Sequence, residues 1–131
     1  MNITLWVIMI CLIPVAGYLT LFLHEASHML FGYLYGYEIK AFKPYPHKNS
    51  SDKWRFGAVY FSGTVSTSGR GMMLIAPLFK SLIFVIIWIV FTFILSPVFL
   101  PFVLWEVIDC MWWFIGYFHT DTWDGGKFRN L

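Results

Sequence analysis

Charged residues are scarce in this chain. Only 12% of its 131 residues are Asp, Glu, Lys or Arg, whereas 59% are hydrophobic and 21% are aromatic. Soluble domains carry about 25% charged residues, so the composition excludes a soluble domain and indicates a single membrane-embedded domain. Cysteine is also scarce. Cys11 and Cys110 lie in apolar segments and form no CxxC pair, so we interpret them as small buried hydrophobic residues.

Three apolar segments are long enough to cross a bilayer, namely residues 3–23, 72–95 and 98–118. They predict an all-α integral membrane protein with about three transmembrane helices. Between the first two segments, residues 37–61 hold aromatic and β-branched runs separated by turn-forming residues, which predict a small β-hairpin at the membrane surface. The hairpin is either a stabilising lid or an edge strand that captures an extended substrate. Residues 62–71 are expected to form a flexible connector.

The first apolar segment is longer than a bilayer requires. Its helical pattern continues to Tyr35, a length of roughly 50 Å, which exceeds the hydrocarbon thickness. Tilting, a kink at Pro14 and Gly17, or an emergent last turn must absorb the excess. We do not expect a cleaved signal peptide, because no basic residue precedes the apolar run and the run is too long.

The first segment leads into an HExxH sequence that runs from His24 to His28. On a helix the two histidines lie on one face and can bind the same cation, while Glu25 can act on a metal-bound water. The flanking residues are apolar, so these groups would be desolvated at a cost of several kcal/mol without a compensating partner. The pattern therefore predicts a zinc site with Glu25 as general base. The alternative is that both histidines only form hydrogen bonds within a helical bundle.

Outside the predicted spans, positive charge is confined to two places. It lies between the first and second spans and after the third, and the link between the second and third spans has none. The positive-inside rule then places the N-terminus outside and the C-terminus in the cytoplasm, and we expect the cell membrane. The residues concerned are Lys40, Lys43, Lys48, Lys53, Arg55, Arg70, Lys127 and Arg129.

A catalytic zinc site normally has three protein ligands, and HExxH supplies two. Because spans one and three end at the same membrane face, residues after the third span can reach the HExxH helix. Asp124 is our first candidate, since Gly125 and Gly126 would allow a close backbone approach. Asp121 and His119 are alternatives, and a capped, solvated tail without a ligand is the remaining interpretation.

The chain resembles the site-2 protease family of intramembrane zinc metalloproteases. The HExxH residues 24–28 are followed by an apolar turn, Gly36 and the strand-like residues 37–42, as in that family. Asp124-Gly125 is similar to the family's Asp-Gly pair, and residues 75–78 are a weaker echo of its Ala-Gly-Pro segment. Two departures are Gly116 and His119, which stand about where the family usually has Asn and Pro. Relatives also continue into another helix or carry PDZ or nucleotide-sensing domains.

The resemblance implies that His24, His28 and Asp124 bind Zn²⁺ and that Glu25 is the catalytic base. The implied activity is hydrolysis of peptide bonds in or near transmembrane segments of membrane proteins. The partners expected are such a substrate and the lipid bilayer, but no nucleic acid, with an oligomer or an accessory membrane subunit left open. Two alternatives are a non-proteolytic metal-binding or metal-transporting membrane protein and a pseudoprotease that acts as an assembly factor. Glu25 favours the protease, because a transporter does not need it.

Three charged residues fall inside the predicted spans. Glu106 and Asp109 are three residues apart and share one helix face, where ionisable groups normally point at a partner or a wet cavity. We expect them to pair with Lys80. The group is either a structural network or part of a water or ion path toward the zinc.

Overall fold

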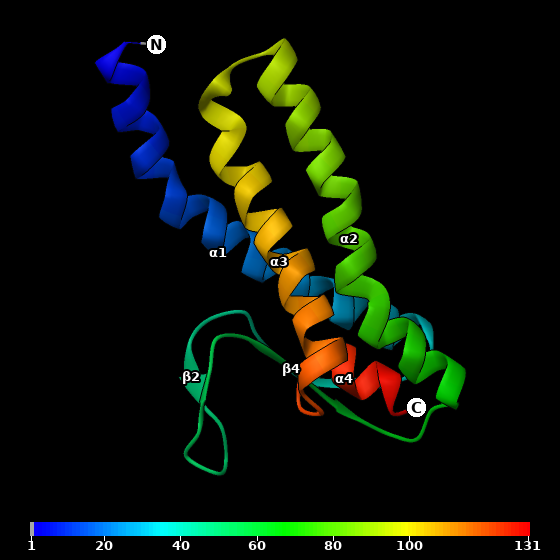
Figure 1. Cartoon of the computed structure of the whole chain (residues 1–131). Helices are drawn as coiled ribbons and strands as arrows, with labels where there is room; N and C mark the ends of the chain where they lie inside the picture. The colour runs from blue at the N-terminus through cyan, green and yellow to red at the C-terminus, as the bar shows by residue number, and fades with distance from the viewer. Residues whose placement is uncertain (1) are drawn as a thin grey trace.

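The computed structural model describes residues 2–131 and confirms the predicted fold class. Within that range three helices are long and apolar enough to cross a membrane, and a small hairpin follows the first of them (Figure 1). The elements in chain order are α1 (Ile3–Leu34), β1 (Glu38–Lys43), β2 (His47–Lys48), β3 (Trp54–Arg55), β4 (Ala58–Ser62), α2 (Thr67–Ile94), the 3₁₀ helix η1 (Pro97–Phe99), α3 (Leu100–His119) and α4 (Asp124–Arg129).

Helix α1 bends in its first half, which is one of the three ways in which its excess length could be accommodated (Figure 1). Figure 1 shows its N-terminal part running down one side of the bundle and its second half crossing behind α2 and α3. Pro14 lies within α1 and has no N–H for the helical ladder. Trp105 of α3 packs against Gly17, and its indole Nε1 donates to the Ile13 carbonyl at 2.8 Å. The bend therefore lies where α3 crosses α1.

A glycine ends α1 and sends the chain into the hairpin. Gly36 has a φ of +90°, in the left-handed region that favours glycine. The N–H groups of Tyr37 and Gly36 donate to the carbonyls of Gly32 and Tyr33, which is the pattern of a Schellman cap. This local signal places β1 directly beside the end of the helix that carries the HExxH residues.

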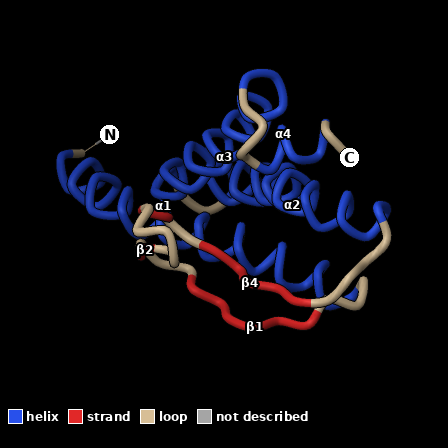
Figure 2. Tube along the Cα trace, turned by 90° about the horizontal axis from the view of Figure 1, so that it is seen from below, coloured by secondary structure: helices blue, strands red, loops and turns tan. Residues whose placement is uncertain are grey.

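The predicted hairpin is present as two short antiparallel ladders. β1 pairs with β4 from Glu38–Ser62 to Lys43–Ala58, with an irregularity between Ile39 and Ala41, and β2 pairs with β3. Seen from below, β4 lies between β1 and the helices (Figure 2). The tip of the hairpin leaves the aromatic side chain of Trp54 exposed.

Helix α2 begins at Thr67, earlier than the start expected at residue 72. Ser66 is the reason, because its side chain caps the helix by accepting a hydrogen bond from the Gly69 N–H at 3.1 Å. The expected connector 62–71 is therefore wrong over its second half. Helices α2 and α3 then run antiparallel, joined by η1 at the end of the bundle opposite the hairpin (Figure 1).

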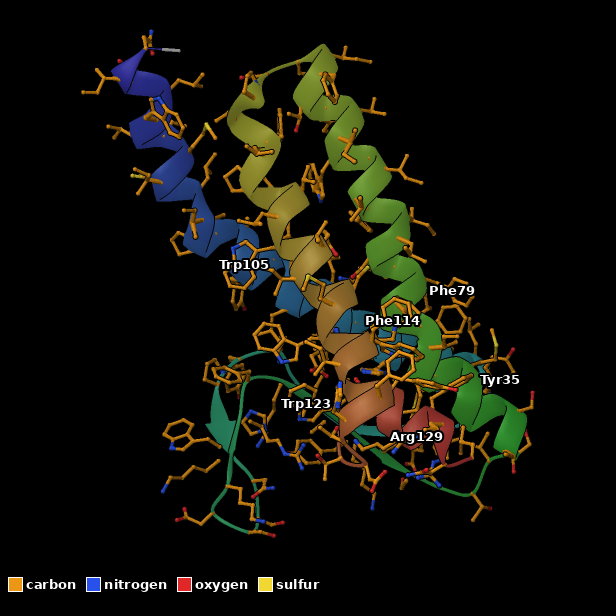
Figure 3. All side chains as sticks on the ribbon, in the orientation of Figure 1. Tyr35, Phe79, Trp105, Phe114, Trp123 and Arg129 are labelled. Atoms are coloured by element: carbon orange, nitrogen blue, oxygen red, sulfur yellow. The ribbon has the colours of Figure 1, made fainter. Side chains whose placement is uncertain are left out.

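The side chains that point away from the bundle are largely apolar. Large hydrophobic residues are exposed along all three long helices, among them Ile3, Ile86, Phe93 and Leu104, and Figure 3 shows side chains projecting from every helix. An apolar surface of this extent suits lipid contact rather than water. The inner faces, by contrast, carry the buried polar and charged groups that form the candidate site.

Candidate metal centre

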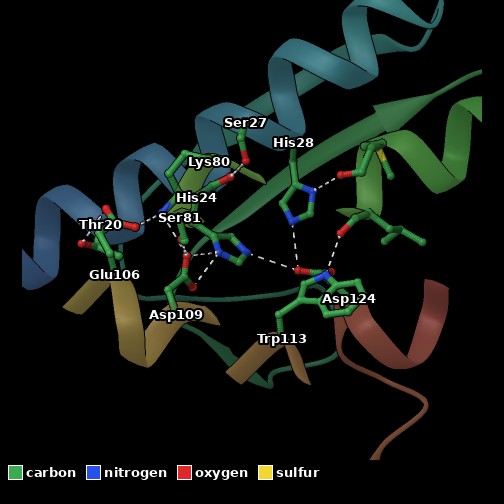
Figure 4. A network of polar contacts seen from close by, with 12 residues as sticks. Thr20, His24, Ser27, His28, Lys80, Ser81, Glu106, Asp109, Trp113 and Asp124 are labelled. Carbon is green, nitrogen blue, oxygen red and sulfur yellow. Dashed lines mark hydrogen bonds and ion pairs between the residues drawn. The ribbon is translucent and has the colours of Figure 1, made fainter. Parts of the chain in front are cut away.

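Two histidines and one aspartate converge where α1, α2 and α4 meet. One ligand atom each from His24, His28 and Asp124 lies within 4.8 Å of the others. The Nε2 atoms of His24 and His28 lie 3.2 and 3.0 Å from the same oxygen, Asp124 Oδ2 (Figure 4). The structure thus brings together His24, His28 and Asp124, the three candidate ligands predicted first from the sequence.

Each histidine is oriented by a partner at its other ring nitrogen. His24 Nδ1 lies 2.9 and 3.1 Å from the two carboxylate oxygens of Asp109, and His28 Nδ1 lies 2.8 Å from the Met73 carbonyl oxygen. A carbonyl oxygen only accepts, so His28 Nδ1 is the donor, and in the neutral ring its Nε2 carries a lone pair. Histidines that bind metals are usually held in this way.

The donor set fits a cation. With a neutral ring protonated at Nδ1, each Nε2 presents a lone pair to the Asp124 carboxylate, so these contacts require positive charge, which either protons on Nε2 or a bound cation supplies. Two imidazoles and one carboxylate are also the kind of ligand set found in catalytic zinc sites that keep a fourth position for water. The residues present could therefore hold Zn²⁺ without any change of side-chain identity.

Two glycines let Asp124 reach this point. A Cβ on Gly125 would overlap the Trp113 carbonyl, and a Cβ on Gly126 would overlap the Thr120 carbonyl. α4 consequently packs directly on the backbone at the end of α3, as the close approach expected from the sequence requires. Asp124 is the first residue of α4, where the exposed N–H groups of a helix favour a negative charge.

Asp124 is ionised in this setting. Burial opposes ionisation, but the charges and hydrogen bonds of His28 and His24 outweigh it and hold the pKa of the Asp124 carboxyl well below its usual range. Lys127 Nζ lies 3.8 Å from the other carboxylate oxygen. The third ligand position therefore carries a negative charge at neutral pH.

The alternative ligands lie elsewhere. Asp121 is exposed over 71% of its side chain and accepts hydrogen bonds from Asn130 and Arg129, which lower its pKa. Arg129 also donates to the Tyr117 carbonyl, so the same contacts tie the end of α4 to the end of α3. His119 is exposed and is not part of the ligand group.

Glu25, the candidate base, is buried beneath the hairpin. Its residue exposure is 8%, and the loop at Gly57 lies directly against its side chain. Within residues 2–131 no hydrogen bond or ion pair to its carboxylate is found. Since no buried side-chain oxygen in this range lacks a partner, the Glu25 carboxylate oxygens keep contact with solvent. A carboxylate that reaches water beside a candidate metal ligand is available to handle a proton.

The three intramembrane charges form one network, and the expected pairing with Lys80 is confirmed. Lys80 Nζ donates to Glu106 Oε2 at 2.7 Å and to Asp109 Oδ2 at 3.0 Å. Ser81 also donates to Asp109, at 2.8 Å, and Thr20 donates to Glu106 at 3.2 Å. The contact between Asp109 and His24 was missed by sequence reasoning, because it depends on how α1 and α3 are rotated against each other.

Comparison with protein-family models, with curated proteins and with solved structures finds no match to this chain. The fold and the site by themselves define a class, a three-helix membrane-type protein with a His₂Asp group at one end of the bundle. Any narrower assignment rests on the residues of that site and on the resemblance carried by its motifs.

Proposed function

We propose that the protein is an intramembrane zinc metalloprotease of the site-2 protease kind. The observation that carries this proposal is the convergence of His24 Nε2, His28 Nε2 and Asp124 Oδ2, with Glu25 adjacent to the first ligand. Zn²⁺ bound there would polarise a scissile carbonyl and lower the pKa of a bound water toward about 7. Glu25 would take the proton of the attacking water and pass it to the leaving amine.

The proposed substrate is a transmembrane segment of another membrane protein. A helical segment hides its carbonyl groups in hydrogen bonds, so it must become extended before its peptide bond can be attacked. β4 is paired with β1 along one edge, its other edge has no strand partner within residues 2–131, and Gly57 immediately before it touches Glu25. An extended peptide added to that edge would pass beside the proposed base.

A metal transporter is a weaker alternative. An ion path along α3 would need carboxylates free to exchange partners. Both Glu106 and Asp109 already contact Lys80, whose side chain is 8% exposed. A pseudoprotease is also disfavoured, because all the groups needed for chemistry are present. For the same protease we propose the cell membrane as its location, with the N-terminus outside and the site toward the cytoplasm.

The deciding experiment separates metal binding from chemistry. Purified Glu25→Gln protein should keep its zinc and its fold but cleave synthetic transmembrane peptides at least about 10²-fold more slowly. Glu38→Gln is the matched control, because Glu38 is exposed in β1 and contacts Ser62, and it should cleave like the wild type. Undiminished cleavage by Glu25→Gln would overturn the mechanism, and metal flux that persists without cleavage would favour the transporter.

A further inference from the structure

We propose that Asp109 is a positioning residue that holds His24 for the metal, and that Lys80 is the cation that keeps Asp109 in place. This inference rests on the metal site of the proposed function and extends that site to residues of α2 and α3. It starts from a difference between the two histidines. His28 is oriented by a neutral backbone carbonyl, whereas His24 is oriented by a carboxylate.

The contacts of Asp109 leave it little freedom. Both of its oxygens lie within 3.1 Å of His24 Nδ1, and Oδ2 additionally accepts from Lys80 at 3.0 Å and from Ser81 at 2.8 Å. A carboxylate opposite Nδ1 fixes the ring so that Nε2 faces the metal, and its negative charge raises the basicity of that nitrogen. The three long helices contribute one or more of these four residues each, so the orientation of His24 depends on the packing of the whole bundle (Figure 4).

Lys80 explains how such a carboxylate can persist in an apolar interior. Asp109 and Glu106 are close to the same ammonium group, and Glu106 is 1% exposed. Two buried carboxylates without a cation would be strongly destabilised. Lys80, Glu106 and Asp109 together carry a single net negative charge, and the Asp124 carboxylate adds a second. Leaving Glu25 aside, since its charge changes during the proposed reaction, a divalent cation would neutralise the cluster.

Asp109 is outside the predicted ligand set and contacts neither Asp124 nor His28 in the hydrogen bonds of residues 2–131. Any effect of Asp109 on metal binding must therefore be transmitted through His24. Removing its charge is expected to weaken metal binding without removing a ligand, by about 10- to 100-fold, which is the range for outer partners of metal-bound histidines. A purely structural role would instead lower the stability of the metal-free protein and leave the affinity of the folded fraction unchanged.

The test is the zinc dissociation constant of the full chain in detergent, measured by competition with a chelator. Asp109→Asn should bind zinc about 10- to 100-fold more weakly than wild type. The matched control is Thr20→Val, which has the same shape and removes only the hydrogen bond to Glu106, and its zinc affinity should stay close to that of the wild type. Cobalt supplies a second readout, because the visible absorption of bound Co²⁺ should change in Asp109→Asn and not in Thr20→Val.

A second variant covers the case in which Asp109→Asn does not fold. Asp109→Glu keeps the charge for Lys80 but moves the carboxylate by one methylene relative to His24, so it should also weaken zinc binding. Wild-type affinity and an unchanged cobalt spectrum in whichever variant folds would overturn the inference while leaving the proposed protease intact. Wild-type protein that binds zinc but cleaves nothing would refute the protease alone, and wild-type protein that binds no divalent metal would refute both.

Discussion

The backbone of Gly57 lies directly against the side chain of Glu25. A Cβ at position 57 would come within 2.8 Å of Glu25 Cγ and 2.9 Å of its Oε1. Gly57→Ala must therefore displace the proposed base, and we expect cleavage to fall by about 10- to 100-fold, since small misplacements of reacting groups have effects of this size. Zinc content should not change, because no ligand is touched.

The control for Gly57 is Gly71→Ala. A Cβ there meets no atom closer than 3.4 Å, and Gly71 is inside a helix, where alanine is tolerated. Cleavage rates of both variants should be compared at equal zinc content. Equal rates for Gly57→Ala and Gly71→Ala would show that the hairpin does not limit the position of Glu25.

The ligand assignment predicts a clear difference between two neighbouring aspartates. Wild-type protein should carry about one zinc per chain, and Asp124→Ala should lose most of it, because two histidines alone do not complete the usual three-ligand site. Asp121→Ala should keep its zinc, since Asp121 is exposed and bound to Arg129. Elemental analysis of the purified proteins measures both. The reverse result would move the third ligand to Asp121.

Lys80 is expected to be important for stability as well as for positioning. Lys80→Met leaves Glu106 and Asp109 buried without their cation, which should destabilise the protein by about 3–5 kcal/mol. Adding Glu106→Gln removes one of the two buried carboxylate charges that lack a cation, and this should restore part of the lost stability. Thermal unfolding in detergent, followed by tryptophan fluorescence, measures the change.

Lys48→Met is the surface counterpart of that variant. The Lys48–Asp52 pair is exposed on both sides and should contribute at most about 1 kcal/mol. A Lys80→Met protein as stable as Lys48→Met would show that the buried network carries no stability, and the role given to Lys80 would then fail.

Orientation in the membrane supplies a prediction that is independent of the metal. We expect a reporter fused after Leu131 to be cytoplasmic and a cysteine placed at Lys48 to be protected from an impermeant reagent outside. Figure 1 places the hairpin and the C-terminus at the same end of the bundle. Modification at the Asn49-Ser50-Ser51 sequon in a glycosylating membrane would put the hairpin outside and reverse the assignment.

The features that could be predicted from the sequence are those with local causes. Long apolar runs gave the three helices, and the i, i+4 spacing gave the shared face of His24 and His28. The choice of Asp124 over Asp121 depended on Gly125 and Gly126, whose packing against α3 the structure displays. Turn residues and aromatic runs likewise indicated the hairpin.

The features that could not be predicted depend on contacts between distant elements. The hydrogen bond of Asp109 to His24 requires a particular rotation of α3 against α1, which is set by contacts such as Trp105 on Gly17. No sequence spacing encodes that rotation. The early start of α2 was missed for another reason, because the small hydroxyl residues around Ser66 are typical of both linkers and helix caps.

The separation of the ligands along the chain has a consequence for biosynthesis. His24 and His28 lie in the first long helix, whereas Asp124 follows the third, one hundred residues after His24. A growing chain therefore displays the two histidines long before their carboxylate partner is synthesised, and the ligand group closes only when α4 folds back onto α3. Incomplete translation products that end before Asp124 would hold the pair of histidines alone, so the proposed metal site could form only late, once the bundle is complete.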